Sequence, residues 1–308
     1  MSYAQVFETM FKLCITMLLG VVLNRLKVIN EEGNKTLSRL IVEVTSPALA
    51  IYAVCGQTGV NTEVIKLVGF GALLYLALPV LAFGIVLLMK PPRALRGVYQ
   101  LLLVFGNVSF MGYPVVQAIY GEQAIFYMNI LNIPFTLMIF TYGVRLLGAG
   151  ELAGGGKLRA GHFLSPGFIS AVLSLLVYLL RIPVPSAIAN TLGFVGNLTT
   201  PLSMLAIGSM IANFSPRALF AERKLFLLTA IKLLAMPVGG FALARVLFAD
   251  PVMVGTVTLS LAMPSGALCA MVSRQHGTDL QAGSAALGVF LTTLVSMITI
   301  PLAIFTFL

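Results

Sequence analysis

Two short segments interrupt long apolar runs with residues that break helices and form hydrogen bonds. The first, at positions 106–121, reads GNVSFMGYPVVQAIYG, and the second, at positions 262–266, reads AMPSG. Both combine glycine and proline with small polar side chains, among them Asn107 and Ser265. Where a helix unwinds, the half-helix that follows presents unpaired N–H groups and a positive dipole end, which bind anions without lysine or arginine. The pattern therefore predicts an anion site at two broken helices.

Proline gives a second reason to place a site at these breaks. It frees the carbonyl four residues earlier, so we expect Pro114 to free that of Phe110 and Pro264 that of Ser260. Inside a membrane, free backbone groups must face protein or a wet cavity. The candidate binding residues at the breaks are Gly106, Asn107, Ser109, Gly112, Pro114, Pro264, Ser265 and Gly266. For Pro79, Pro134 and Pro237 we favour a packing kink instead.

Other polar residues also fall inside apolar stretches. Glu43 is the acidic residue placed well inside one, so its carboxyl is a candidate for proton coupling or gating. A protonated or hydrogen-bonded structural role is the alternative. Asn132 and Ser46 join the candidate binding residues, although packing hydrogen bonds fit Asn132 equally well. For Lys232, snorkelling, an internal pair and a binding role all stay open.

The composition indicates where these elements lie. The chain is 59% hydrophobic and 9% charged, with a mean hydropathy of +1.01, whereas a soluble domain carries about 25% charged residues. This predicts an all-α protein that spans the lipid bilayer several times. The net charge of +9 does not indicate a nucleic-acid partner, because the lysines and arginines are dispersed through loops.

We expect neither a cofactor nor a metal. Cys14, Cys55 and Cys269 lie in or at the ends of apolar spans and are interpreted as packing residues. No ligand cluster surrounds His162 or His276 in the sequence. The apolar stretches hold no nucleophile–base pair, so the protein is not expected to be an enzyme.

Apolar runs separated by charged or turn-forming clusters predict ten spans. They lie near residues 5–26, 35–55, 63–89, 95–120, 123–147, 166–181, 187–213, 219–248, 251–275 and 279–306. With the N-terminus outside, inner loops hold 14 of the 19 lysines and arginines, and outer loops hold 3. This bias predicts that both termini are outside.

The sequence also predicts two halves. The polar stretch 148–165, interpreted as a cytoplasmic linker, separates residues 1–147 from 166–308. Five spans in each half mean that any repeat must be inverted. The triplet at 45–47, Thr-Ser-Pro, is echoed by Thr-Thr-Pro at 199–201.

A second pair of similar sequences aligns the two breaks in the repeat register. Ala-Leu-Pro-Val at 77–80 is echoed by Ala-Met-Pro-Val at 235–238. This register, carried forward, aligns Gly106-Asn107 with Pro264-Ser265. The two echoes and this alignment support an internal repeat.

Three longer motifs carry a family resemblance. They are FMGYPVVQAIYG (110–121), TPLSMLAIGSMIA (200–212) and AMPSGALCAMVSRQHGTDLQAG (262–283). Over essentially the whole chain the sequence resembles the auxin efflux carrier family, which includes plant PIN proteins and bacterial carriers often assigned to malonate or malate. The motifs of the fourth and ninth spans are the most specific.

The resemblance implies ten helices in two inverted five-helix repeats, like those of bile-acid symporters and sodium–proton antiporters. Helices 1, 2, 6 and 7 would form a scaffold, and helices 3–5 and 8–10 a mobile transport domain. Helices 4 and 9 would be broken and cross at mid-membrane. The resemblance also implies a homodimer through the scaffold and, for a bacterial member, a place in the inner membrane.

The resemblance also points to particular site residues. In the plant proteins, an asparagine seven residues before a helix 4 proline contacts the substrate carboxylate; the matching residue here is Asn107, seven before Pro114. The helix 9 crossover falls on Pro264. Gly106 stands where the plant pattern has proline, so a softer break is expected.

The expected function is secondary transport of a small organic carboxylate by an elevator-type alternating-access mechanism. Malonate, malate and an indole-3-acetate-like anion are the candidate substrates. The alternative is a cation-coupled antiporter or symporter of the same fold for a non-carboxylate solute. Such coupling normally needs paired mid-membrane acids, which the fourth, fifth and ninth spans lack. Inverted broken helices favour alternating access over a passive channel.

Overall fold

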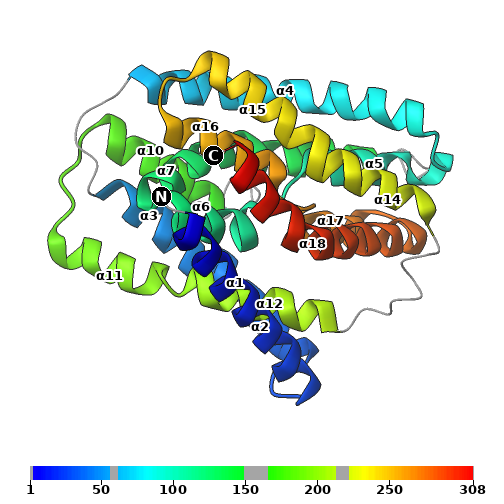
Figure 1. The fold of residues 1–308 in the computed structure, drawn as a ribbon, viewed down its shortest axis with the longest axis horizontal. Coiled ribbons are helices and arrows are strands. Elements are labelled where there is room, and N and C mark those ends of the chain that lie inside the picture. Colours follow the sequence, from blue (N-terminus) through cyan, green and yellow to red (C-terminus); the bar gives the residue numbers. More distant parts are fainter. Residues whose placement is uncertain (1–2, 56–61, 149–165, 213–221, 308) are drawn as a thin grey trace.

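The structure, a computed structural model, describes residues 3–55, 62–148, 166–212 and 222–307. Every regular element in these ranges is a helix (Figure 1), and the one β-type pairing is an isolated bridge. In chain order the α-helices and the short π or 3-10 turns (η) are α1 (Tyr3–Arg25), α2 (Glu31–Leu40), η1 (Ile41–Thr45), α3 (Ser46–Cys55), α4 (Thr62–Met89), η2 (Arg93–Leu95), α5 (Arg96–Val104), η3 (Val108–Gly112), α6 (Tyr113–Tyr120), α7 (Glu122–Met138), η4 (Ile139–Gly143), α8 (Val144–Leu147), α10 (Pro166–Leu179), α11 (Ser186–Gly196), α12 (Thr199–Ala212), α14 (Arg223–Ala230), η5 (Ile231–Ala235), α15 (Met236–Leu247), α16 (Pro251–Ala262), α17 (Ala267–His276) and α18 (Asp279–Phe307).

Within the described residues, six continuous helical segments are long and apolar enough to cross a membrane. They are Glu31–Cys55, Thr62–Met89, Glu122–Leu147, Ser186–Ala212, Arg223–Leu247 and Asp279–Phe307. Two shorter apolar helices, Pro166–Leu179 and Pro251–Ala262, accompany them. The prediction of an all-α, multi-pass membrane protein is confirmed by these segments.

Large apolar side chains cover the outside of the bundle as well as its interior. Leu88 near the end of α4 and Val246 near the end of α15 are each 83% exposed. The two helices run along one edge of the molecule (Figure 1). Exposed leucine and valine are unfavourable in water, whereas lipid tails are as apolar as they are. This surface suits a bilayer.

Three of the π-helical turns end two residues before a proline. They are η1 before Pro47, η3 before Pro114 and η5 before Pro237. Because proline lacks an N–H and crowds the carbonyl four residues earlier, the helix widens locally. These prolines widen their helices without ending them. The break in the predicted fourth span therefore lies before Val108 and not at Pro114.

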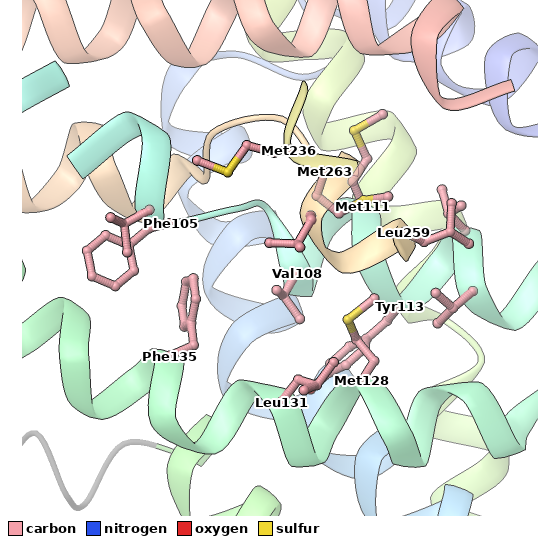
Figure 2. Packing of buried hydrophobic residues seen from close by; sticks show 14 of the residues in the cluster. Phe105, Val108, Met111, Tyr113, Met128, Leu131, Phe135, Met236, Leu259 and Met263 are labelled. Carbon is pink, nitrogen blue, oxygen red and sulfur yellow. The ribbon is translucent and has the colours of Figure 1, made fainter. Parts of the chain in front are cut away.

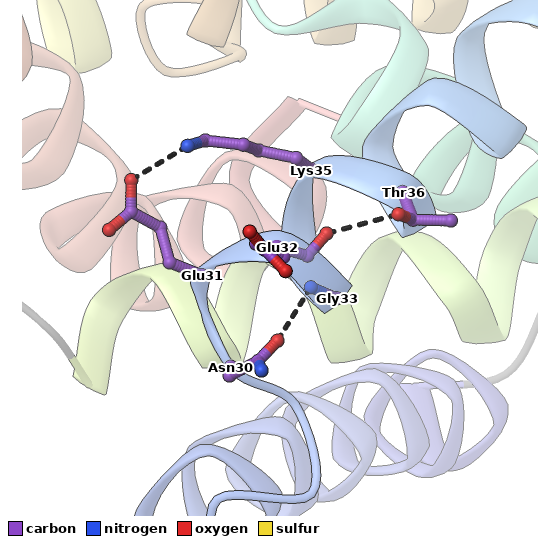
Figure 3. A network of polar contacts seen from close by, with 6 residues as sticks. All are labelled: Asn30, Glu31, Glu32, Gly33, Lys35 and Thr36. Atoms are coloured by element: carbon purple, nitrogen blue, oxygen red, sulfur yellow. Dashed lines mark hydrogen bonds and ion pairs between the residues drawn. The ribbon is translucent and has the colours of Figure 1, made fainter.

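Capping at α2 corrects the predicted start of the second span. The sequence predicts that start at residue 35, whereas the helix begins at Glu31. The side-chain oxygen of Asn30 accepts a hydrogen bond from the Gly33 N–H at 2.7 Å, and Lys35 pairs with Glu31 at 2.9 Å (Figure 3). A polar, capped segment thus precedes the apolar run that the prediction followed.

The core is built around the end of α5. Residues 101–105 are all buried there. The ring of Phe105 meets that of Phe135 on α7 edge to face, with 5.4 Å between centroids (Figure 2). Phe135 meets Tyr75 of α4 in the same way at 5.9 Å. Aromatic contacts therefore hold α4, α5 and α7 together beside the first break.

Helices α1 and α12 approach until their backbones touch. A Cβ atom added at Gly208 would collide with the Met17 carbonyl, and one added at Gly20 would collide with the Leu205 carbonyl. Small residues at such a contact let membrane helices pack closely. This pair of glycines therefore fixes the distance between α1 and α12.

We expect Gly208→Ala to lower the free energy of unfolding by about 1–3 kcal/mol, because overpacking pushes the two backbones apart. Gly84→Ala in α4 is the matched control: nothing lies within 4 Å of a Cβ there, and alanine favours a helix over glycine. Thermal unfolding of the purified proteins measures both. Equal stability of the two variants would contradict the close approach of α1 and α12.

Candidate functional site

The two breaks predicted from the sequence lie against each other. One separates α5 from η3, and the other separates α16 from α17. Gly106 and Ser265 form an antiparallel bridge. The Asn107 N–H donates to the Pro264 carbonyl at 2.7 Å, and the Gly266 N–H donates to the Phe105 carbonyl at 3.0 Å. Each break thus supplies the hydrogen-bond partners that the other has lost.

Glycine is required where the two broken segments of the chain cross. A Cβ added at Gly266 would lie 2.8 Å from the Gly106 carbonyl oxygen, closer than a real Cβ comes. A Cβ added at Gly106 would lie 3.4 Å from both the Met263 Cβ and the Ser260 carbonyl oxygen. The backbone of one break can therefore approach the other only because position 266 lacks a side chain.

A cavity of about 130 Å³ lies beside the crossover. One water requires roughly 10–15 Å³, so the space suits a small molecule. Its walls come from η3, α12, α17 and α18 and include Asn107, Phe110, Ile207, Ile211, Ala267, Phe290 and Thr293. Asn107 and Thr293 are the polar members of a lining that is otherwise apolar.

Two half-helices begin at this cavity. Phe110, in the first turn after the α5 break, and Ala267, the first residue of α17, both line it. The first N–H groups of a helix have no intrahelical partner, and they carry the positive end of the dipole. Both positive ends therefore meet the same space, and the described residues that line it carry no charge.

Asn107 is positioned by its own backbone. Its N–H binds across the crossover, and its carbonyl accepts from the N–H groups of Met111 at 3.2 Å and Gly112 at 2.9 Å. The residue is 6% exposed, and its side-chain amide makes no hydrogen bond within the described part of the chain. The residue forms part of the cavity wall, so its amide can face that space instead of a protein partner.

Ser265 has a different role in this conformation. Its hydroxyl donates to the Leu102 carbonyl at 2.8 Å, and its N–H donates to the Thr292 hydroxyl at 3.1 Å. Ser265 is fully buried. The predicted ligand residue therefore acts here as a cap on the end of α5.

The remaining predicted residues of the first break support its geometry. Gly112 closes the π turn against the Asn107 carbonyl, and Pro114 lies in the first turn of α6. Ser109 is half-buried in η3. Among all the site residues predicted from the sequence, Asn107 lines the cavity and the others do not.

Asn132 and Ser46 lie apart from the cavity lining. Both are buried, and the Asn132 Oδ1 and the Ser46 Oγ have no hydrogen-bond partner within the described residues. One turn from Asn132, Asn129 accepts from the Tyr113 hydroxyl at 3.0 Å and donates to the Ser174 hydroxyl at 2.5 Å. Asn129 therefore links α7 to α6 and α10.

Glu43 lies on the outer face of its helix. Its side chain is 44% exposed and pairs with Arg39, one turn earlier, at 2.9 Å. An exposed carboxylate with an adjacent guanidinium has a local explanation that requires no substrate. Glu43 does not line the cavity beside the crossover.

Sequence reasoning did not place two residues at the cavity. Phe110 and Thr293 line it. Phe110 was singled out for its backbone carbonyl alone, and Thr293 falls within an apolar run where nothing in the spacing distinguishes it. Lys232, whose role the sequence left open, donates to the Leu103 carbonyl at 2.7 Å, and this partner is 129 residues away in sequence.

The chain is similar to known membrane transport proteins along nearly its whole length. A family model described as membrane transport protein matches residues 5–304. An uncharacterized transporter of Methanothermobacter thermautotrophicus is 25% identical over 304 residues, covering 96% of each chain. An uncharacterized transporter of Methanocaldococcus jannaschii is 22% identical over 305 residues, covering 94% of each chain.

The geometry of Asn107 and Ser265 predicts different effects on the ligand-free protein. Asn107→Ala should leave the unfolding temperature near that of the wild type, because its side chain makes no described hydrogen bond. Ser265→Ala should destabilise by about 1 kcal/mol, since the Leu102 carbonyl loses a buried donor. Thermal unfolding without ligand compares the two. A greater loss in Asn107→Ala than in Ser265→Ala would show that the Asn107 amide is structural.

Proposed function

Because the chain belongs to the membrane transport protein family, that of the auxin efflux carriers, we propose that it is a secondary transporter of a small organic carboxylate. That it is a membrane transporter follows from the family and from the apolar helices. The carboxylate substrate is inferred from the cavity at the crossover.

The observation that carries this proposal is the unpartnered Asn107 amide between two helix N-termini. An amide N–H and the first N–H groups of a half-helix are donors, and a carboxylate is an acceptor at each of its oxygens. The positive dipole ends favour a negative charge at this point. With no charge among the described lining residues, we propose that the backbone supplies most of the attraction.

We propose the ten-span, inverted-repeat architecture for the whole chain, with 1–147 and 166–308 as the repeats. The contact between the two breaks supports this arrangement, because the predicted register places those segments opposite each other. On the family resemblance we also propose a homodimer through the scaffold, located in the bacterial inner membrane with both termini outside.

An elevator-type movement requires an interface that can separate. Between α6 and the α11–α12 junction, Gln117 donates to Asn197 at 3.0 Å and accepts from the Thr200 hydroxyl at 3.1 Å. Neutral hydrogen bonds of this kind contribute about 1 kcal/mol each. We propose that they hold the transport domain against the scaffold in this conformation and exchange for others when it moves.

The cavity position favours an inward-facing state. From α12 it is lined by Met210 and Ile211, next to the helix end at Ala212. From α18 it is lined by Ala286, two turns after the start at Asp279. The loops predicted to be cytoplasmic adjoin both of these helix ends. We propose that the substrate reaches Asn107 from that side.

The cavity lining also suggests an order of affinity among the candidate substrates. A monocarboxylate with an apolar body can place its charge at Asn107 and its body against Phe110 and Phe290. A dicarboxylate would leave its second charge among apolar side chains, which is costly without a partner. We therefore expect indole-3-acetate to bind at least roughly tenfold more tightly than malonate or malate.

Thermal shifts of the purified protein with each acid test this, since a ligand of the folded state raises the unfolding temperature with saturation. Asn107→Ala should lose the shift, whereas Ser265→Ala, destabilised but with an intact cavity wall, should keep it. A shift with cations or neutral solutes and with none of the acids would favour the alternative carrier of a non-carboxylate solute.

A further inference from the structure

Lys232 is a buried cation with an unusual partner. It lies in η5 between α14 and α15 and is 1% exposed. Its ammonium donates to the Leu103 carbonyl of α5 at 2.7 Å. The ion pairs among the described residues join other side chains, and none includes Lys232. A buried charge requires compensation, and the hydrogen-bond acceptor that it has here is a backbone carbonyl.

The end of α5 can supply that compensation. Leu103 is in the last turn of the helix, which ends at Val104, and the C-terminal end of a helix dipole is negative. A lysine beside the last carbonyls is stabilised by them, the more so when water is excluded. Lys232 therefore neutralises the dipole of the half-helix that stops at the crossover.

The neighbouring carbonyls are already occupied by protein donors. The Leu101 carbonyl accepts from the Phe105 N–H at 3.1 Å, and the Leu102 carbonyl accepts from the Ser265 hydroxyl at 2.8 Å. The Phe105 carbonyl accepts from the Gly266 N–H at 3.0 Å. A metal cation needs several oxygen ligands at once, and these carbonyls do not offer such a set.

In transporters with broken helices, the C-terminal ends of half-helices and unwound carbonyls coordinate a coupling sodium ion. Here a side chain occupies that position. We propose that the Lys232 ammonium is a built-in counter-ion at the crossover, which takes the place of a coupling metal cation and makes the folded site independent of sodium. The importance of this charge for transport rests on the proposed function, whereas the contact of Lys232 with the end of α5 does not depend on which substrate is carried.

The lysine belongs to one half of the chain. In the register that aligns Ala77 with Ala235, the position matching Lys232 is Leu74, which is buried and apolar. This positive charge therefore has no counterpart at the matching position of the other half, and its partner Leu103 is four residues before Asn107. A bound monocarboxylate would be balanced by this charge, so that the loaded transport domain would cross the membrane without net charge at the crossover.

The first test uses the ligand-free wild type. Its unfolding temperature should be the same in sodium chloride, choline chloride and potassium chloride at equal ionic strength. A rise specific to sodium would overturn the proposal, because the site would then bind the ion that Lys232 is said to replace.

The second test removes the charge of Lys232 by mutation and then supplies a soluble cation to the variant. Lys232→Ala deletes the atoms of a propylammonium group, so adding n-propylammonium or sodium should raise its unfolding temperature, while tetramethylammonium, too large for the space, should not. Leu233→Ala, at the next buried position of η5, loses packing alone and should respond to none of these cations.

Equal responses of Lys232→Ala and Leu233→Ala to every cation would show a packing role and refute the proposal. If Lys232→Ala does not fold, Lys232→Met, which keeps most of the apolar volume of the side chain, replaces it in the sodium arm. Lys232→Arg should keep wild-type behaviour. None of these readouts uses a carboxylate, so a failed carboxylate shift in the wild type would count against the proposed substrate and leave this result standing.

Discussion

The structure depends on one constraint: backbone N–H and C=O groups inside a membrane must find partners within the protein. Two helices that stop inside the helical bundle expose such groups, and in isolation each break would cost several kcal/mol. Here the breaks pair with each other through Asn107, Pro264, Gly266 and Phe105. The crossover is therefore stable only as a pair, and the helices around it are arranged to bring the two breaks together.

The same constraint gives the crossover two regions, one with free hydrogen-bond donors and one with occupied acceptors. The N-terminal ends of η3 and α17 adjoin the cavity, where donors remain for a ligand. At the C-terminal end of α5 the acceptors are filled by Ser265 and Lys232. One side of the break is thus closed by the protein, and the other keeps free donors beside a cavity whose described lining carries no charge, which is the basis of the proposed anion site.

Glycine and proline serve different ends in this chain. Gly266 and Gly208 allow backbones to approach, at the crossover and between α1 and α12 respectively. Pro47, Pro114 and Pro237 follow π turns that widen otherwise continuous helices. Rigid, close-packed contacts therefore surround a few points where the helical geometry changes. The hydrogen bonds of Gln117 with Asn197 and Thr200 are weak by comparison, which suits the movement proposed at this interface.

The sequence by itself determined the membrane class, the family and the location of the breaks, because low charge, long apolar runs and glycine–proline clusters are local properties of the chain. It also identified Asn107. It misplaced the start of α2, since the cap at Asn30 lies in polar sequence. It also assigned Ser265 to the ligand and left the role of Lys232 open. Only the tertiary structure decided these roles, because Leu102 and Leu103 are 163 and 129 residues from the side chains that bind them. Partners so distant leave no periodic signal, and hydrogen bonds between them exist only once the helices have packed.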